Sequence, residues 1–113
     1  MIYKKHLSEP WFSLVKLKIK SVEGRLNKGI FLNLKVGDII EFYNDDIINR
    51  KFKVKITKIN TYNTFEEYLK KETLKKCLPG YMKIKDGLQV YHKYYSIEDE
   101  KKYKIKCFAM ELL

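Results

Sequence analysis

The sequence predicts an α+β fold in which helices pack against a small, strongly bent β-sheet or barrel. Segments that alternate between apolar and polar residues indicate strands, and segments with helical spacing behind a capping residue indicate helices. No repeat and no linker rich in proline, glycine or serine divides the chain. The 113 residues match the length of one domain, so we expect a single domain over residues 1–113.

The first predicted elements are a helix and a short strand. Residues 8–10 have the pattern of a helix start with Ser8 as the capping hydroxyl, and the helix is expected to end near Lys18. An extended segment over residues 21–26 follows it. Gly24 within this segment predicts either a bulge or a close approach of the backbone to another part of the chain.

The clearest strand signal is a hairpin in the middle of the chain. Residues 39–43 predict a strand, and a turn at 44–46 leads into a second strand over 50–59. Two sets of residues alternate along the second strand, Phe52, Val54 and Ile56 on one side and Lys51, Lys53 and Lys55 on the other. We therefore expect one face of the sheet to be core and the other to present the three lysines, which we call the lysine ladder.

The second half of the chain is expected to be mainly helical. Residues 64–67 have the form of a capping box for a helix that continues to about Lys76. Asp86 is the expected cap of a short helix over 87–95.

A single helical turn and a strand complete the prediction. Ser96 is the expected cap of the turn, and residues 103–112 predict the closing strand. The predicted order is therefore helix, strand, strand, strand, helix, helix, strand.

The charge balance favours a polyanionic partner. Lysine and arginine number 24 against 14 aspartate and glutamate, which gives a formal net charge of +10. Such a density first suggests nucleic acid. Abundant lysine can also serve only to keep a surface soluble, so the charge alone leaves both explanations open.

Apolar runs in the sequence are far shorter than the roughly 18 residues of a membrane span. The N-terminal segment soon becomes polar and includes Glu9, unlike a secretory signal. We therefore expect a cytoplasmic protein that is not inserted in a membrane.

Cysteine and histidine give no sign of a metal centre, so we expect no metal and no other cofactor. Cys77 and Cys107 lack the short spacing of a metal site and are expected to be reduced and buried. His6 and His92 lack a cysteine or acidic partner at metal spacing, and we interpret both as surface or core filling.

The richest polar cluster lies where the first helix meets the following strand, and its members are Lys16, Lys18, Lys20, Ser21, Glu23 and Arg25. For hydrolysis, Glu23 would hold or deprotonate water, while Lys20 or Arg25 would stabilise the charge that develops on oxygen. On an ideal strand Lys20 points away from Glu23 and Arg25, so convergence requires Lys20 in the turn or a bulge at Gly24. Ligand binding without catalysis and a surface ion pair between Glu23 and Arg25 are the alternatives.

Aromatic side chains are a second resource for binding. Nucleic-acid bases stack on flat rings while lysine and arginine follow the phosphates. Trp11, Tyr94 and Tyr95 are the candidates for stacking. Trp11 lies on an apolar helix, so it is also expected in the core.

Five segments, in order, resemble the ASCH family, the activating-signal-cointegrator homology domains. These segments are 9–12, 20–27, 35–42, 64–67 and 95–100, and the resemblance spans nearly the whole chain. It implies a PUA-like fold, a pseudo-barrel of bent strands with flanking helices.

The resemblance also implies an RNA-related role, with Lys20, Ser21, Glu23 and Arg25 lining a basic cleft between the first helix and the first predicted strand. Many members have glycine where this chain has Lys18. Some bacterial members hydrolyse the acetyl amide of N4-acetylcytidine with a lysine, a threonine three residues later and a distant glutamate. Lys20 matches that lysine, whereas Glu23 stands in the place of the threonine.

The sequence therefore predicts a domain that binds RNA or a modified nucleoside. Its expected binding residues are Lys16, Lys18, Lys20, Ser21, Glu23, Arg25, Lys51, Lys53, Lys55, Trp11, Tyr94 and Tyr95. The alternative is a hydrolase in the same cleft, either an N4-acetylcytidine amidohydrolase or a metal-independent ribonuclease, with Lys20 and Glu23 as its catalytic residues. A protein-interaction adaptor is the third possibility.

Overall fold

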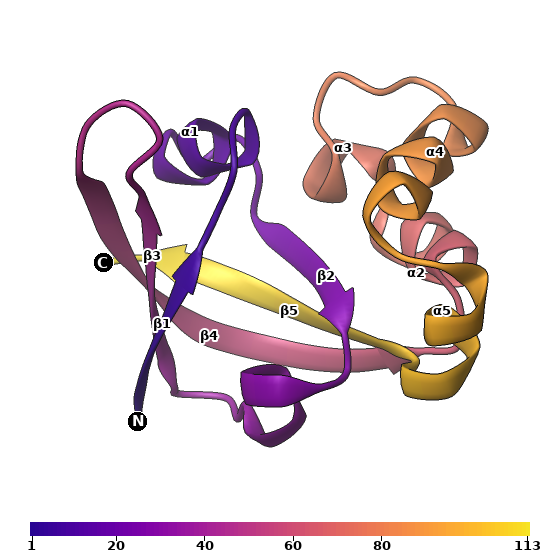
Figure 1. Ribbon diagram of the computed structural model, residues 1–113, viewed down its shortest axis with the longest axis horizontal. Helices are drawn as coiled ribbons and strands as arrows, with labels where there is room; N and C mark the ends of the chain where they lie inside the picture. The colour runs from indigo at the N-terminus through magenta and orange to yellow at the C-terminus, as the bar shows by residue number, and fades with distance from the viewer.

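The computed structural model describes residues 1–113, with strands and helices alternating in the first part of the chain and helices clustered in the second (Figure 1). The elements are β1 (Ile2–His6), α1 (Trp11–Lys16), β2 (Val22–Leu26), a 3₁₀ helix η1 (Gly29–Asn33), β3 (Ile39–Asn44), β4 (Arg50–Tyr62), α2 (Phe65–Glu72), α3 (Leu74–Cys77), α4 (Ile84–Tyr94), α5 (Ile97–Tyr103) and β5 (Ile105–Leu112).

All five strands form one curled sheet in the order β1-β3-β4-β5-β2. β1 pairs in parallel with β3, and the other neighbours are antiparallel. The pairing of β4 with β5 shifts register between Ile56 and Lys58, and such a bulge bends a strand. Helices α2 to α5 gather at one end of the long β4 and β5 strands, while α1 lies towards the other end (Figure 1). The predicted α+β, PUA-like architecture is confirmed.

Two hydrophobic clusters lie side by side along the sheet. The first packs Phe12 and Val15 of α1 against β3, β4 and η1. The second packs Phe65 and Tyr68 of α2 against β2, β5 and the neighbouring helices. The partly buried Trp11 contacts both clusters, so it stands at the boundary between the two halves of the fold.

The predicted hairpin is confirmed as the antiparallel pair β3 and β4. Val54 and Ile56 are fully buried and Phe52 is partly buried, whereas the lysine ladder is exposed. The period of two in the sequence therefore predicted the faces of this strand correctly.

The N-terminal part differs from the prediction in three respects. Residues 2–6 form an edge strand that the sequence did not predict, because its pairing with β3 is long-range and three of its five residues are lysine or histidine. The helix ends at Lys16 rather than Lys18, whose φ of 64° is left-handed. The Ser8 hydroxyl does not cap α1; instead the Glu9 carboxylate accepts hydrogen bonds from the backbone N–H and the hydroxyl of Ser13.

In the helical half, two predicted caps are confirmed and one is wrong. The Thr64 hydroxyl accepts from the Glu67 backbone N–H, and Ser96 accepts from Asp99. Asp86 does not cap a helix, because α4 begins earlier, at Ile84, and places Asp86 in its first turn.

Two further boundaries move in this half. The helix expected to reach Lys76 breaks at Thr73, where φ is 81°, and therefore forms two helices, α2 and α3. The expected single turn after Ser96 is the seven-residue α5, so the last strand begins at Ile105 instead of Tyr103.

Neither of the two cysteines forms a disulfide, and both are buried, as predicted. None of the helices is both long enough and apolar enough to cross a lipid bilayer.

Candidate functional site

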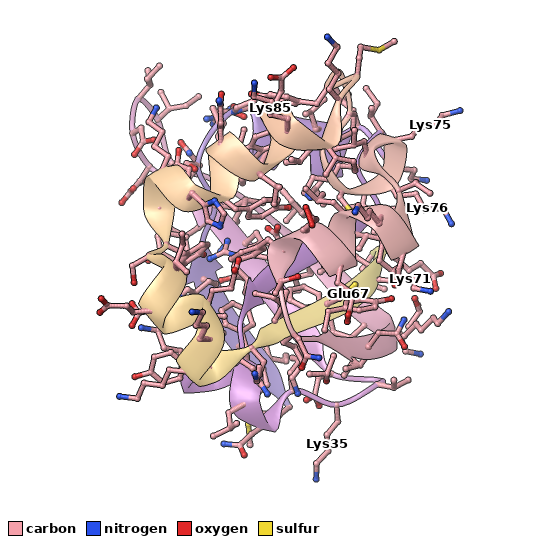
Figure 2. The ribbon with its side chains drawn as sticks, turned by 90° about the vertical axis from the view of Figure 1, so that its right-hand side faces the viewer. Lys35, Glu67, Lys71, Lys75, Lys76 and Lys85 are labelled. Atoms are coloured by element: carbon pink, nitrogen blue, oxygen red, sulfur yellow. The ribbon has the colours of Figure 1, made fainter.

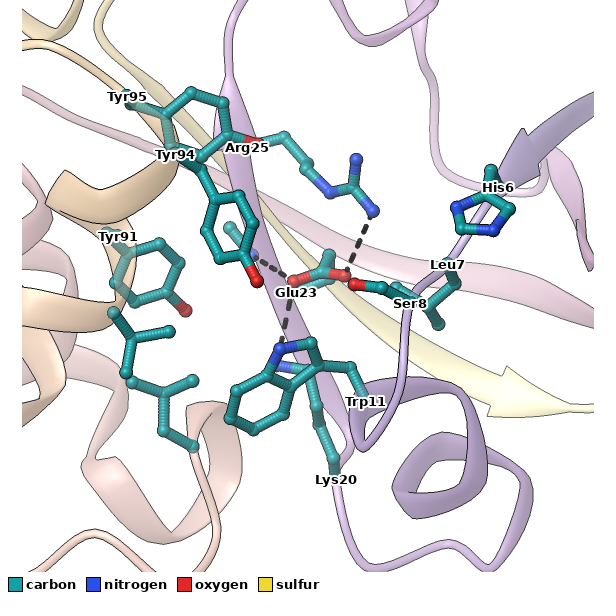
Figure 3. A pocket seen from close by; sticks show the side chains of 13 residues that line it. His6, Leu7, Ser8, Trp11, Lys20, Glu23, Arg25, Tyr91, Tyr94 and Tyr95 are labelled. Carbon is teal, nitrogen blue, oxygen red and sulfur yellow. Dashed lines mark hydrogen bonds and ion pairs between the residues drawn. The ribbon is translucent and has the colours of Figure 1, made fainter. Parts of the chain in front are cut away.

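A pocket of about 330 Å³ opens between β2, α4 and the segment that joins β1 to α1 (Figure 3). This volume lies near the lower end of the range of about 300–1,000 Å³ that small-molecule sites span. The lining residues are His6, Leu7, Ser8, Trp11, Lys20, Glu23, Gly24, Arg25, Leu78, Val90, Tyr91, Tyr94 and Tyr95. The pocket thus combines three charged side chains from one short segment with aromatic rings from two helices.

The charged floor of the pocket follows from the alternation of β2. Val22 and Leu26 point into the second hydrophobic cluster, so Glu23 and Arg25 face the opposite side of the strand. Lys20 lies in the turn before β2. Of the two arrangements that would let Lys20 converge with Glu23, a place in the turn or a bulge at Gly24, the structure has the first. Figure 3 shows all three charged groups meeting at the same point.

Lys20 is a buried ammonium with several partners, and its residue is only 2% exposed. Its Nζ donates hydrogen bonds to the carbonyl of Val22, at 2.5 Å, and to the carbonyl of Cys77 at the end of α3. The same nitrogen lies 3.6 Å from Glu23 Oε1 and 5.8 Å from the centre of the Trp11 ring. Lys20 therefore ties the start of β2 to α3 and compensates the buried carboxylate.

Glu23 is held between two cations at the pocket floor. Its Oε1 accepts from the Gly24 backbone N–H at 3.2 Å, and its Oε2 lies 3.5 Å from Nη2 of Arg25. The expected ion pair between Glu23 and Arg25 is therefore present, but its predicted place on the surface is wrong, because Glu23 is only 6% exposed. A carboxylate can accept about four hydrogen bonds, and Glu23 therefore keeps acceptor capacity for a ligand.

Gly24 is required by a close approach, and the predicted bulge is absent. Gly24 pairs with Cys107 in an unbroken antiparallel register. A Cβ at this position would lie 2.5 Å from Cζ of Tyr68, because the Tyr68 ring covers the backbone of β2. The Tyr68 hydroxyl lies 3.1 Å from that of Tyr91, which links the strand to the pocket wall on α4.

Three tyrosines at the end of α4 differ in exposure. Tyr91 is buried, Tyr95 is partly buried and Tyr94 is 59% exposed. Burial raises the pKa of Tyr91, and the negative charge of Glu23 raises it further. Burial also raises the pKa of Tyr95, against the opposing effect of Arg25. Both hydroxyls therefore stay protonated at neutral pH and can donate hydrogen bonds.

The structure brings together about half of the residues that the sequence singled out. Trp11, Lys20, Glu23, Arg25, Tyr94 and Tyr95 all line the pocket. Lys18 and Ser21 line a separate hollow of about 280 Å³ on the other side of Lys20, and Lys16 is exposed on α1. None of the three ladder lysines lines the pocket.

Sequence reasoning missed several members of the pocket wall. Tyr91 could have been found, since its spacing of three and four residues from Tyr94 and Tyr95 places all three on neighbouring parts of one helix face. Leu7 and Ser8 carried no such signal, because they reach the pocket only through the long-range pairing of β1 with β3.

The two histidines have acidic partners that their sequence spacing did not reveal. His6 Nε2 lies 3.5 Å from Asp46 Oδ1, and ligand atoms of His6, Asp45 and Asp46 all lie within 4.8 Å of one another. These three residues are the group with the geometry to hold a metal ion, although exposed acidic groups often lie together without one. His92 Nε2 lies 3.2 Å from Glu100.

A curled five-stranded mixed sheet with clustered helices, and a charged pocket against β2, define a small PUA-like α+β domain. The chain belongs to the ASCH domain family, whose model matches residues 6–113. The resemblance inferred from the sequence segments is therefore confirmed.

Solved structures of similar proteins support this assignment. The hypothetical protein PH0355 is 35% identical with a TM-score of 0.91, and the alignment covers 100% of both chains. Protein PF0455 from Pyrococcus furiosus is 38% identical with a TM-score of 0.81, covering 100% of this chain and 98% of the other.

A mutant of the ASCH protein from Zymomonas mobilis is 11% identical with a TM-score of 0.61, covering 97% of this chain and 67% of the other, and supports the fold alone. A search of curated proteins finds no match to this chain.

Proposed function

We propose that this ASCH domain binds RNA or a modified nucleoside in the pocket over β2. The single observation behind the proposal is a buried carboxylate, Glu23, flanked by Lys20 and Arg25 at the bottom of a pocket with aromatic walls. Membership of a family associated with RNA binding and with hydrolases supports the same class of ligand.

The chemistry of the floor suits the polar edge of a nucleobase. A carboxylate recognises a base by accepting from an exocyclic amino group, as Glu and Asp do with cytosine N4. Arg25 presents a planar set of donors that can pair with a carbonyl or a ring nitrogen. Glu23 and Arg25 together therefore offer an acceptor next to a donor, which is the pattern that a base edge displays.

The walls of the pocket suit the flat face of the same base. The Trp11 ring lies on one side and the Tyr94 ring on the other (Figure 3). Stacking on such rings contributes about 1–3 kcal/mol per base. The base would thus be recognised on its edge by charged groups and on its faces by aromatic groups.

Binding without turnover is favoured by the partners of the two potential catalytic groups. Lys20 already donates to two backbone carbonyls, and both oxygens of Glu23 lie beside cations. A general base needs a free lone pair directed at the attacking water, and an oxyanion needs a free donor. These contacts leave Lys20 with little free capacity for such a role.

Hydrolysis in the same pocket is the second candidate. The 3.6 Å separation of Lys20 Nζ and Glu23 Oε1 favours it, since an amine beside a carboxylate can shuttle a proton. The substrate would be N4-acetylcytidine or an RNA phosphodiester. Lys20 and Glu23 would then be the catalytic residues.

A fluorescence titration tests the proposal, because Trp11 is the only tryptophan of the chain. Nucleosides and short single-stranded RNA should quench its emission. Arg25→Lys should weaken the binding roughly tenfold, since an ammonium cannot replace a planar guanidinium. Arg50→Lys is the matched control, because Arg50 is also partly buried and ion-paired but lies outside the pocket.

Chromatography of the same mixtures separates the remaining functions. Release of cytidine from acetylated cytidine, or shortening of the RNA, would establish a hydrolase. If the protein shows no binding and forms no product, the proposal is contradicted and the protein-interaction adaptor remains as the function.

A further inference from the structure

A third hollow adjoins the pocket along α4 and the start of α1. It is an open groove of about 700 Å³ between the start of α1, the loop before α4 and α4 itself. We call it the side groove, and its lining residues are Glu9, Pro10, Trp11, Gly80, Tyr81, Met82, Asp86, Gln89, Val90, Lys93 and Tyr94. Trp11, Val90 and Tyr94 line both the pocket and the side groove, so the two form one continuous depression.

The helix α4 presents a different face to each part of this depression. Asp86, Gln89, Val90 and Lys93 follow the spacing of one helix face and line the side groove. Tyr91 and Tyr95 lie next to that face and line the pocket instead. The helix therefore acts as a shared wall.

The side groove exposes apolar and aromatic groups that the core does not use. Met82 is 90% exposed and Tyr81 is 37% exposed. The rings of Tyr81 and Trp11 lie 6.4 Å apart between centroids, with 33° between their planes. Such rings on the surface beside a ligand pocket are typical of base stacking.

The charges of the side groove fit a second nucleotide. The charge of Glu9 is compensated by Arg50 at 2.9 Å, and its oxygens already accept hydrogen bonds from Ser13. Lys93 supplies a cation for a phosphate, and Asp86 and Gln89 supply groups for a base edge.

We propose that the ligand is single-stranded RNA of at least two nucleotides, with one base in the pocket and its neighbour in the side groove. The second base packs against Tyr81, and the connecting phosphate lies towards Lys93. This inference rests on the proposed function and narrows it, because a free nucleoside would fill only the pocket.

Binding of a dinucleoside monophosphate and of the corresponding mononucleotide, followed by Trp11 fluorescence, tests the inference. The dinucleotide should bind the unmodified protein about tenfold more tightly, which is the range expected for one additional stacked base. Tyr81→Ala should remove most of that tenfold advantage and leave mononucleotide binding unchanged. Tyr43→Ala is the matched control, because Tyr43 is 38% exposed and lies outside both the pocket and the side groove.

The outcomes separate this inference from the proposed function. Equal affinity for the two ligands, or an equal loss of both on Tyr81→Ala, would overturn the second subsite while leaving the pocket as a nucleotide site. Failure of both ligands to bind the unmodified protein would overturn the proposed function itself. Tight binding of a peptide in place of either nucleotide would overturn both.

Discussion

The charged floor of the pocket and the lysine ladder contain similar charges in contrasting settings. Both were predicted as nucleic-acid contacts from their polar residues. Glu23 and Lys20 are buried and bonded to named partners, whereas the ladder lysines of β4 stand in solvent. Under the proposed function, we therefore expect the buried charges with fixed geometry to provide specificity and the exposed charges to provide general attraction.

Exposed positive charge is found on more than one face of the molecule. The helical end displays Lys71, Lys75, Lys76 and Lys85 at positions far from the ladder in sequence (Figure 2). Interactions between such exposed charges are screened by salt, over about 10 Å at 0.1 M ionic strength. A charge of +10 that is spread in this way favours polyanions without selecting a sequence.

The largest expected effect is on stability and concerns Lys20. Lys20→Met should lower the free energy of unfolding by about 3–5 kcal/mol, because it removes one partner of a buried ion pair and leaves two carbonyls without their donor. Lys53→Met on the ladder should change it by only about 0.5 kcal/mol or less. Urea denaturation of both variants measures the contrast, and equal stabilities would contradict it.

Gly24→Ala should destabilise the domain by about 1–3 kcal/mol. The added Cβ would lie 2.5 Å from Cζ of Tyr68, so the ring or the strand must move. Thermal unfolding measures this loss. In combination with Tyr68→Leu, which removes the ring, the glycine substitution should cost much less than it does alone, and a fully additive double variant would refute the clash.

Replacement of Lys51 and Lys53 by glutamate should weaken RNA binding to every sequence alike. Affinity for RNA falls as salt rises, and each phosphate that the protein no longer neutralises should make the fall of log affinity with log salt less steep by about 1. Binding of an uncharged nucleoside should be unchanged. Titrations of RNA between low and moderate salt test this, and an affinity that hardly responds to salt would exclude a ladder that acts through phosphates.

The smallest effect is a loss of stability at alkaline pH. Burial raises the pKa of the Cys77 thiol from 9.0 to about 11. The unfolded chain therefore releases this proton before the folded chain does, so stability falls as pH rises from about 9 towards 11 and is unaffected by this group below that range. At about pH 10 the loss should be about 1 kcal/mol. Denaturation at several pH values should give a shallower decline for Cys77→Ala, and identical declines would contradict the assignment.

Local patterns predicted those elements whose signals lie within a few residues. The period of two in β4 gave its faces, and Thr64 and Ser96 marked the starts of α2 and α5 correctly. The strand β1 was missed because its stability comes from parallel pairing with a strand more than thirty residues away. The break at Thr73 also has no local signal, since only its left-handed φ separates α2 from α3.

The sequence predicted the residues of the pocket floor, but it missed several residues of the pocket wall. Lys20, Glu23 and Arg25 lie within six residues, so the strand period and the turn were enough to suggest their convergence. His6 and Ser8 reach the same pocket through tertiary packing, which the spacing of residues does not encode. Ser21 was included because the family resemblance implies it and the ladder because of its charge, and neither lines the pocket.

Binding of an uncharged nucleoside to Glu23→Gln at high salt is the most direct test of the central claim, that recognition resides in the buried floor of the pocket. High salt suppresses the exposed lysines, and the amide keeps the shape of the carboxylate while replacing one acceptor with a donor. Glu41→Gln is the matched control, since Glu41 is 12% exposed and ion-paired but lies on β3 outside the pocket. We predict that the folded Glu23→Gln protein binds at least about tenfold more weakly, while Glu41→Gln binds as the unmodified protein does. Unchanged binding by a folded Glu23→Gln protein would contradict the account and remove Glu23 from the site.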